Sequence, residues 1–231
     1  MQPHKPRVII ACKVVQSLIE TCLVETAIST VFMEYGLHRT PALMVAALQE
    51  KVDQILSPSV IILGYGLCGN GLVGLKARAH TLIVPRVHDC ITMFLGSHKR
   101  YLEDFSSEPG TYYLTKGWLE SGSNPLDEYQ ALVEKYDRET ADWIIDAQYR
   151  NYKRLVLVAP TRAELQLCRS RAVEVAAFCA ARWGFRCEER LGSDEFVKQL
   201  VTRAPQLGES TDDFLVIPPG SEIKQEMFWR E

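Results

Sequence analysis

The chain has 231 residues, 47% of them hydrophobic, and a formal net charge of −3 at pH 7. This composition can fill one large core or two modest ones. The basic residues are spread along the chain rather than gathered into a stripe, so nucleic acid is not an expected partner. No apolar run is long enough to span a membrane, and the start lacks the pattern of a signal peptide. We therefore expect a cytoplasmic protein that does not cross a membrane.

Short β-branched runs alternate with helical patterns along the chain, which is typical of a parallel α/β fold. In the first part, strands are expected at 7–12, 27–37, 59–66 and 81–87. Helices are expected between them, at 16–26, 41–56, 71–79 and 90–105. The second of these helices has the clearest signals, because Thr40 can cap it and Pro41 suits its first position.

The segment 106–125 is rich in Gly, Pro and Ser around an aromatic core, so we expect a long structured loop there. After it the pattern predicts a long helical stretch at 126–152, a strand at 154–160, a helix at 161–183, a strand at 185–192, a helix at 193–203 and a strand at 214–220. This predicts two Rossmann-like lobes with mainly parallel sheets and a cleft at the strand carboxyl ends. Their expected ranges are 1–120 and 121–231, the second lobe being a βαβαβ unit.

Three cysteines follow predicted strands of the first lobe. Cys12 ends the first strand, Cys68 lies in the turn after the third, and Cys90 comes shortly after the fourth. The carboxyl ends of parallel strands share one edge of a sheet, so these thiols are expected to lie close together. Three thiolates form a soft ligand set suited to zinc or an iron–sulfur cluster, with His88 as a fourth ligand or a proton carrier.

Packing is the competing explanation, because free cysteine is among the most buried residue types. Taken singly, each of the three cysteines is as well explained by a core role. The other four sit inside helical or strand patterns and are assigned to packing: Cys22, Cys168, Cys179 and Cys187. The odd total of seven fits a reducing compartment better than a disulfide framework. Asp89 is expected to cap the helix beginning at Cys90 or to act in catalysis, and His88 can equally face water.

The stretch "GYGLCG", residues 64–69, matches the glycine pattern of a dinucleotide-binding turn, and it follows a strand. The connection to the next strand is short for a crossover helix, which counts against a nucleotide site. We favour a second interpretation, in which Gly66, Gly69 and Gly71 let the backbone curl so that its N–H groups point at a thiolate or a bound anion.

The stretch "PGTYYLTKGW", residues 109–118, combines aromatic residues, a lysine and glycines. It suits a lid over a cleft, with Tyr113 as part of an aromatic wall and Lys116 contacting a small anionic substrate. A surface loop whose aromatic residues plug the interface between lobes explains the same pattern equally well.

Three motifs, "YGLCGNGL", "PRVHDCITMFLGS" and "PGTYYLTKGW", occur in this order. Together they resemble the bacterial and archaeal family known as domain of unknown function 1638, over most of the chain from "VIIAC" to "FLVIPPG". The resemblance implies shared residues at Cys12, Cys68, His88, Asp89 and Cys90, and a shared lid-like segment. It also implies an association with corrinoid-dependent methyltransferase components, hence with one-carbon metabolism.

The expected function is a metal–thiolate protein that acts as an enzyme or accessory enzyme in corrinoid-linked methyl-group metabolism. A zinc ion held by the three cysteines lowers the pKa of a substrate thiol, which then accepts a methyl group. Expected partners are a small-molecule substrate and a corrinoid protein or methyltransferase. Two alternatives stay open: a nucleotide-binding enzyme that uses the glycine turn, and a non-catalytic metal carrier or partner protein of a methyltransferase.

Overall fold

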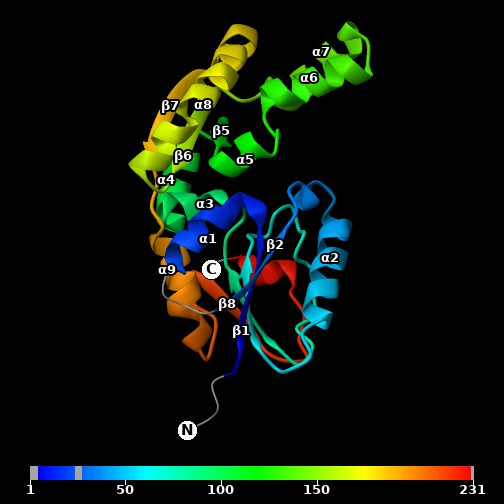
Figure 1. The fold of residues 1–231 in the computed structure, drawn as a ribbon, viewed down its shortest axis with the longest axis vertical. Helices are drawn as coiled ribbons and strands as arrows, with labels where there is room; N and C mark the ends of the chain where they lie inside the picture. Colours follow the sequence, from blue (N-terminus) through cyan, green and yellow to red (C-terminus); the bar gives the residue numbers. More distant parts are fainter. Residues whose placement is uncertain (1–4, 24–27, 230–231) are drawn as a thin grey trace. The chain divides into compact units, whose positions relative to one another are not determined.

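Figure 1 shows the computed structural model, which describes residues 5–23 and 28–229. The fold is mixed α/β with mainly parallel pairing between strands. The chain divides into two compact units, the first made of Met1–His98 with Asp194–Glu231 and the second of Lys99–Ser193. Within the described residues, no helix is both long and apolar enough to cross a membrane.

A five-stranded sheet forms the centre of the first unit, in the order β2-β1-β3-β4-β8. Its strands are β1 (Arg7–Cys12), β2 (Ser29–Met33), β3 (Val60–Gly64), β4 (Thr81–Pro85) and β8 (Phe214–Ile217). The first four are parallel, and β8 runs antiparallel to β4. Because β2 and β3 flank β1 on opposite sides, the strand order reverses between β1 and β3, where ligands bind in open sheets of this kind.

Helices cover both faces of this sheet, so its central strands are nearly continuous apolar runs. The helical elements are η1 (Lys13–Val15), α1 (Gln16–Cys22), η2 (Leu37–Arg39), α2 (Pro41–Asp53), α3 (Ile91–Leu95), α9 (Glu195–Thr202), η3 (Ala204–Gln206) and η4 (Gln225–Phe228). In Figure 1, α1 and α9 lie on one side of the sheet and α2 on the other. Pro41 opens α2 as predicted, but the Thr40 side chain makes no capping hydrogen bond.

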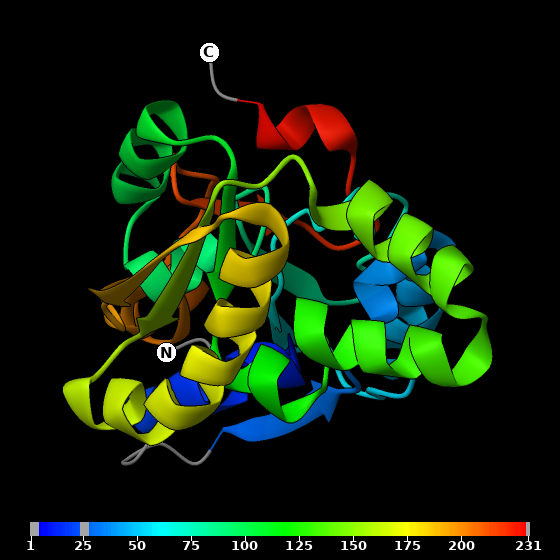
Figure 2. The same ribbon diagram turned by 90° about the horizontal axis from the view of Figure 1, so that it is seen from above.

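The second unit has a three-stranded parallel sheet in the order β5-β6-β7. Its strands are β5 (Thr111–Leu114), β6 (Arg154–Ala159) and β7 (Arg186–Leu191). Its helices are α4 (His98–Ser107), which starts at the last residue of the first unit, α5 (Lys116–Glu120), α6 (Pro125–Lys135), α7 (Arg138–Tyr149) and α8 (Arg162–Trp183). The long helix α8, yellow in Figure 2, packs on β6 and β7.

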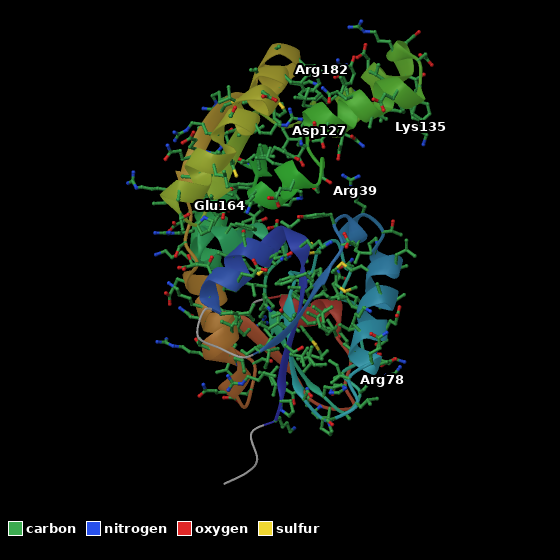
Figure 3. All side chains as sticks on the ribbon, viewed as in Figure 1. Arg39, Arg78, Asp127, Lys135, Glu164 and Arg182 are labelled. Atoms are coloured by element: carbon green, nitrogen blue, oxygen red, sulfur yellow. The ribbon has the colours of Figure 1, made fainter. Side chains whose placement is uncertain are left out.

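Charged side chains tie α8 to the helical hairpin before it. Arg182, labelled in Figure 3, bonds Asp146 through Nε at 2.6 Å and Asp142 through Nη1 at 2.8 Å, both on α7. Arg171 pairs with Asp127 at the start of α6. Aromatic rings of α7 and α8 pack in one hydrophobic cluster with an aromatic ring of β5 and with one that directly precedes β7. The second unit therefore has its own core.

Several predicted elements are wrong or differ in extent. The helix expected at 71–79 is absent, although all these residues are described. Left-handed backbone at Asn70, Gly74 and Arg78 is incompatible with a right-handed helix. The amides of Gly74 and Ala77 instead donate to carbonyls of residues 221–223 at 2.8 Å each. The helix expected at 90–105 is two helices, because Gly96 has a φ of +82° between α3 and α4.

The strand expected at 27–37 ends at Met33, and its first residue, 27, lies outside the described residues. The helical stretch expected at 126–152 is likewise two helices, separated where Tyr136 and Asp137 adopt extended backbone.

The division of the chain differs from the predicted ranges 1–120 and 121–231. The segment 106–125, expected to be a loop, holds β5 and α5, and β5 pairs with β6 of the second sheet. The last strand, β8, joins β4 in the first sheet, so it does not complete a βαβαβ unit. A strand's local pattern does not say which sheet it joins, and this choice of partner decides the boundaries.

Candidate functional site

The chain segments that follow β3 and β4 remain paired beyond the strands themselves. The Leu67 N–H donates to the Val87 carbonyl at 2.8 Å, and the Cys68 N–H donates to the His88 carbonyl at 2.9 Å. Cys68 is therefore held beside the "HDC" segment that carries Cys90. The predicted proximity of these two motifs follows from backbone hydrogen bonds.

Cys12 reaches the same edge of the sheet from the neighbouring strand. The last paired residues of β1 and β3 are Ala11 and Gly64. A Cβ on Gly64 would lie only 2.4 Å from the Cβ of Ala11, so glycine is required for this close approach. The next residue on each strand, Cys12 and Tyr65, comes directly after this pair. Cys12, Tyr65 and Cys68 thus gather where the strand order reverses.

Gly66 and Gly71 are packing residues in this structure, although both were predicted to shape a cofactor loop. A Cβ on Gly66 would lie 2.9 Å from the carbonyl carbon of Asp89, so only glycine lets the two backbones come this close. A Cβ on Gly71 would lie 2.5 Å from Sδ of Met44. The Gly66 backbone lowers the pKa of the Cys68 thiol, against the larger effect of burial.

The backbone at Cys68 is strained. Cys68, Gly69 and Asn70 have φ angles of 48°, 64° and 70°, and the Gly71 N–H closes the turn on the Cys68 carbonyl at 3.2 Å. A positive φ is costly for a non-glycine residue and concentrates at functional sites. The hydrogen bonds of the turn fix the backbone of Cys68 in this unfavourable conformation.

The three thiols share one electrostatic environment. Burial raises the pKa of Cys68 to about 12, and the charges of Asp89 and Cys12 add to the effect. Burial also raises the pKa of Cys90, together with Cys68, Asp89 and Cys12. Burial raises the pKa of Cys12, opposed by a hydrogen bond from the Val14 N–H. Each of the three thiols is therefore protonated at neutral pH in the metal-free chain.

Tyr65 lies at this edge of the sheet as well and was not among the residues predicted from the sequence. Its side chain is 3% exposed, and its hydroxyl has no hydrogen-bond partner among the described residues. Its pKa is raised by burial and by Cys12, Cys68 and Cys90. The signal in the sequence was its place directly after the β3 strand, at the same level as Cys12, inside a motif interpreted by its glycines alone.

His88 and Asp89 lie beside this cluster. The side chain of His88 is exposed. The Oδ1 of Asp89 accepts a hydrogen bond from the Ile91 N–H at 2.9 Å. The helix α3 starts at Ile91 with Cys90 in the cap position, so Asp89 lies one residue before the position predicted for it. Asp89 therefore fixes the start of α3 and with it the position of Cys90.

The cysteine cluster does not have the geometry of a formed metal site. Within residues 5–23 and 28–229, no group of three or more His, Cys, Asp or Glu side chains is arranged to hold a metal ion. Cys12 raises the pKa of Cys68, and Cys12 and Cys68 raise that of Cys90, without the three forming such a group. Their backbones are fixed by the contacts above, so side-chain rotation is the remaining freedom.

Tyr113 and Lys116 belong to the second unit, and the predicted lid is part of its regular structure. Tyr113 lies on β5, and its hydroxyl donates to Asp104. Burial alone would raise the pKa of Asp104, but hydrogen bonds from Tyr113, Arg190 and Arg154 outweigh it and lower that pKa. Lys116 is the first residue of α5, and its Nζ lies 3.6 Å from Oε1 of Glu120.

The remaining cysteines have different surroundings. Cys168 and Cys179 are buried in the core of the second unit, as predicted. Cys22 is half-buried at the end of α1. Cys187 is exposed on β7, so its assignment to packing is wrong.

The glycine turn lacks the element that a dinucleotide site needs. In that site the pyrophosphate sits at the N-terminus of the helix that follows the turn. All of residues 65–80 are described, and none of them lies in an α-helix.

A family model described as "Protein of unknown function (DUF1638)" matches residues 32–201, which is well over half of the chain. The matched part includes Cys68, His88, Asp89 and Cys90, whereas Cys12 precedes it. Comparisons with curated proteins and with solved structures found no match.

Proposed function

The chain belongs to the DUF1638 family, and on that premise we propose that its first unit holds a metal–thiolate centre on Cys12, Cys68 and Cys90. The metal is zinc or the iron of an iron–sulfur cluster, both of which prefer thiolate ligands. The observation that carries the proposal is that three cysteines follow three neighbouring strands, β1, β3 and β4, at one edge of the sheet.

The donor chemistry suits a bound cation. Burial, Asp89 and neighbouring cysteines raise the pKa values of Cys68 and Cys90, so these thiols become thiolates at neutral pH only if a positive charge offsets these effects, and a metal ion would supply it. The unpaired, buried Tyr65 hydroxyl is a second sign that this site interacts with something beyond the chain. Closing the site on a metal requires rotation of the cysteine side chains.

His88 is proposed as the fourth ligand or as a proton carrier, since its side chain is exposed beside Cys90. Asp89 is a positioning residue through its bond to the start of α3. Tyr113 has no role in this proposal, because its hydroxyl is engaged with Asp104. Lys116 has none either, because it pairs with Glu120.

We extend the proposal to methyl-group chemistry on the strength of the family resemblance. The chain would be an enzyme or accessory enzyme that works with a corrinoid protein or methyltransferase, and its small substrate would carry a thiol. When bound, zinc supplies a lowered thiol pKa, and His88 accepts the released proton. The seven free cysteines support a reducing, cytoplasmic location.

We also propose that both units are Rossmann-like lobes. Helices on both faces and the order β2-β1-β3-β4 support a Rossmann-like first lobe with a ligand cleft at the strand carboxyl ends. For the second unit, the parallel sheet with α8 between β6 and β7 supports a smaller lobe of the same kind.

Anaerobic titration of the metal-free chain with Co²⁺ tests the metal centre, because thiolate ligands give an intense charge-transfer absorption. We expect saturable binding with this absorption, and its loss or strong weakening in each of Cys12→Ser, Cys68→Ser and Cys90→Ser. Cys187→Ser is the matched control, because this thiol is exposed in the second unit. Binding without the thiolate absorption, or equal binding by all four variants, would contradict the proposal.

A further inference from the structure

Strand β7 lies at the edge of the second sheet, and one side of its backbone is open. Among the described residues it pairs with β6 alone, and most of its residues are exposed. The N–H groups of Arg186 and Gly192 both donate to the β6 side, at 3.0 and 2.8 Å. Because alternate residues of a strand bond the same neighbour, the backbones of Cys187, Glu189 and Leu191 face the open side. Within the described part of the chain, no backbone hydrogen bond reaches them there.

An open strand edge pairs readily with another strand, and the charges of β7 restrict which strand fits. When two copies of β7 pair antiparallel, residues that face outward must lie opposite one another. A register centred on Glu188 then places Arg186 opposite Arg190, so like charges meet. A register centred on Glu189 places Glu188 opposite Arg190 on both sides of the two-fold axis, so opposite charges meet. A register centred on Cys187 overlaps only half of the strand.

The helix α8 flanks this edge on one face of the sheet. Its Arg169 bonds Glu189 through Nε at 2.6 Å and through Nη2 at 2.7 Å, which compensates the carboxylate that would lie on the axis. Further along the helix, the Ala176 carbonyl lies 3.7 Å from the Cys187 sulfur. Val173 is on the same helix face between these two contacts, and it is 59% exposed. Apolar surface therefore accompanies the open strand.

We propose that β7 pairs with β7 of a second copy of this chain, antiparallel and centred on Glu189. The two three-stranded sheets join into one continuous sheet. A two-fold contact uses the same patch of both copies, and the charges of β7 complement themselves in this way. Cys187 of each copy then lies opposite Leu191 of the other, and the exposed Val173 side chains gain apolar cover. The contact is small, so the dimer is weak and reversible. It does not depend on the proposed metal centre.

Sedimentation velocity of the full chain, from low to high micromolar concentration under reducing conditions, tests the pairing. We expect a reversible monomer–dimer equilibrium. Val173→Arg should raise the dimer Kd about tenfold, because it removes apolar surface and adds like charges across the axis. Leu167→Arg is the matched control, since Leu167 is 71% exposed on another face of the same helix. A monomer at every concentration, or equal dimerisation by the two variants, would overturn the proposal.

Oxidative cross-linking tests the register. Residues directly opposite in a hydrogen-bonded antiparallel pair have Cα atoms about 5.5 Å apart, which a disulfide can join. Glu189→Cys combined with Cys187→Ser should therefore give a covalent dimer on mild oxidation. Cys187→Ser alone should give none, and the wild type should give little, because its Cys187 lies opposite Leu191. Cross-linking through Cys187 in the wild type, or none through residue 189, would contradict pairing centred on Glu189.

Discussion

The residues around Cys68 show how single positions build the site. Gly66 admits the backbone of Asp89, and Gly71 admits the side chain of Met44. Gly69 has free space where a Cβ would lie, and its contribution is a positive φ. The spacing of these glycines in the sequence is the same whether a glycine serves close packing or turn geometry. The two roles can be told apart only from the atoms that a Cβ at each glycine would meet in the structure.

His80 provides a prediction at the same scale, on how stability depends on pH. It is 2% exposed, and its Nδ1 accepts a hydrogen bond from the Ser59 N–H at 3.2 Å. Burial lowers its pKa below the ordinary 6.5, and the opposing effects of Asp53 and the Ile55 backbone are weaker. The unfolded chain thus takes up this proton more readily than the folded chain. The neutral, buried form of His80 therefore stabilises the folded chain. This contribution to the free energy of unfolding is complete above about pH 6.5 and is lost as the pH falls to the lower pKa that His80 has in the folded chain.

Urea unfolding between pH 7 and pH 5 measures this effect. The His80 contribution to the slope is at most about 1.4 kcal/mol per pH unit, the limit for one proton. His80→Asn is the control, because its Oδ1 can accept the Ser59 N–H but does not titrate. The wild type should lose more stability than this variant over the range. Equal losses would show that His80 does not titrate on unfolding in this range.

Among helices and strands, local sequence patterns predicted most strands and long helices. They did not predict where a helix is interrupted or which strands pair. β1 matches its predicted range, and β6 and α8 each agree to about a residue, because apolar runs and helical spacing are local signals. The helix predicted over 71–79 failed because its amides bond residues near the carboxyl end of the chain. The predicted lid failed because its Tyr-Tyr pair is a strand whose partner, β6, follows much later in the sequence.

The attachment of α4 to the second sheet gives a prediction at this scale. The Asp104 side chain is 5% exposed and accepts bonds from Tyr113, from Arg190 at 2.5 Å and from Arg154 at 3.0 Å. Removing its charge leaves the buried Arg154 guanidinium with weaker compensation. Asp104→Asn should therefore lower the free energy of unfolding by about 3 kcal/mol, measured in urea.

Glu103→Gln on the same helix is the control for Asp104→Asn. Glu103 forms an exposed pair with Lys99 at 3.9 Å, so its loss should change stability by less than about 1 kcal/mol. Similar effects from the two substitutions would mean that the buried network does not hold α4 to the sheet.

At the scale of the whole molecule, the chain leaves the first unit after His98 and returns to it at Asp194. The return supplies α9 and the edge strand β8, which pairs antiparallel with β4. The periodicity of the sequence does not show that β8 pairs with β4. The prediction of two lobes that follow one another along the chain therefore differs from the observed units. That the segments carrying Cys12, Cys68 and Cys90 follow strands at one edge of the sheet was predictable, because the edge at which parallel strands end depends only on their shared direction. Tyr65 was not, since an unpaired hydroxyl is visible only in three dimensions.

The most direct test of the metal centre is to purify the chain without oxygen and to measure its metal content by elemental mass spectrometry. We expect about one zinc ion per chain, or iron with sulfide, in the wild type and in Cys187→Ser. The metal should be lost when Cys12, Cys68 and Cys90 are all replaced by serine. A wild-type chain without zinc or iron, or a triple variant that keeps its metal, would contradict it.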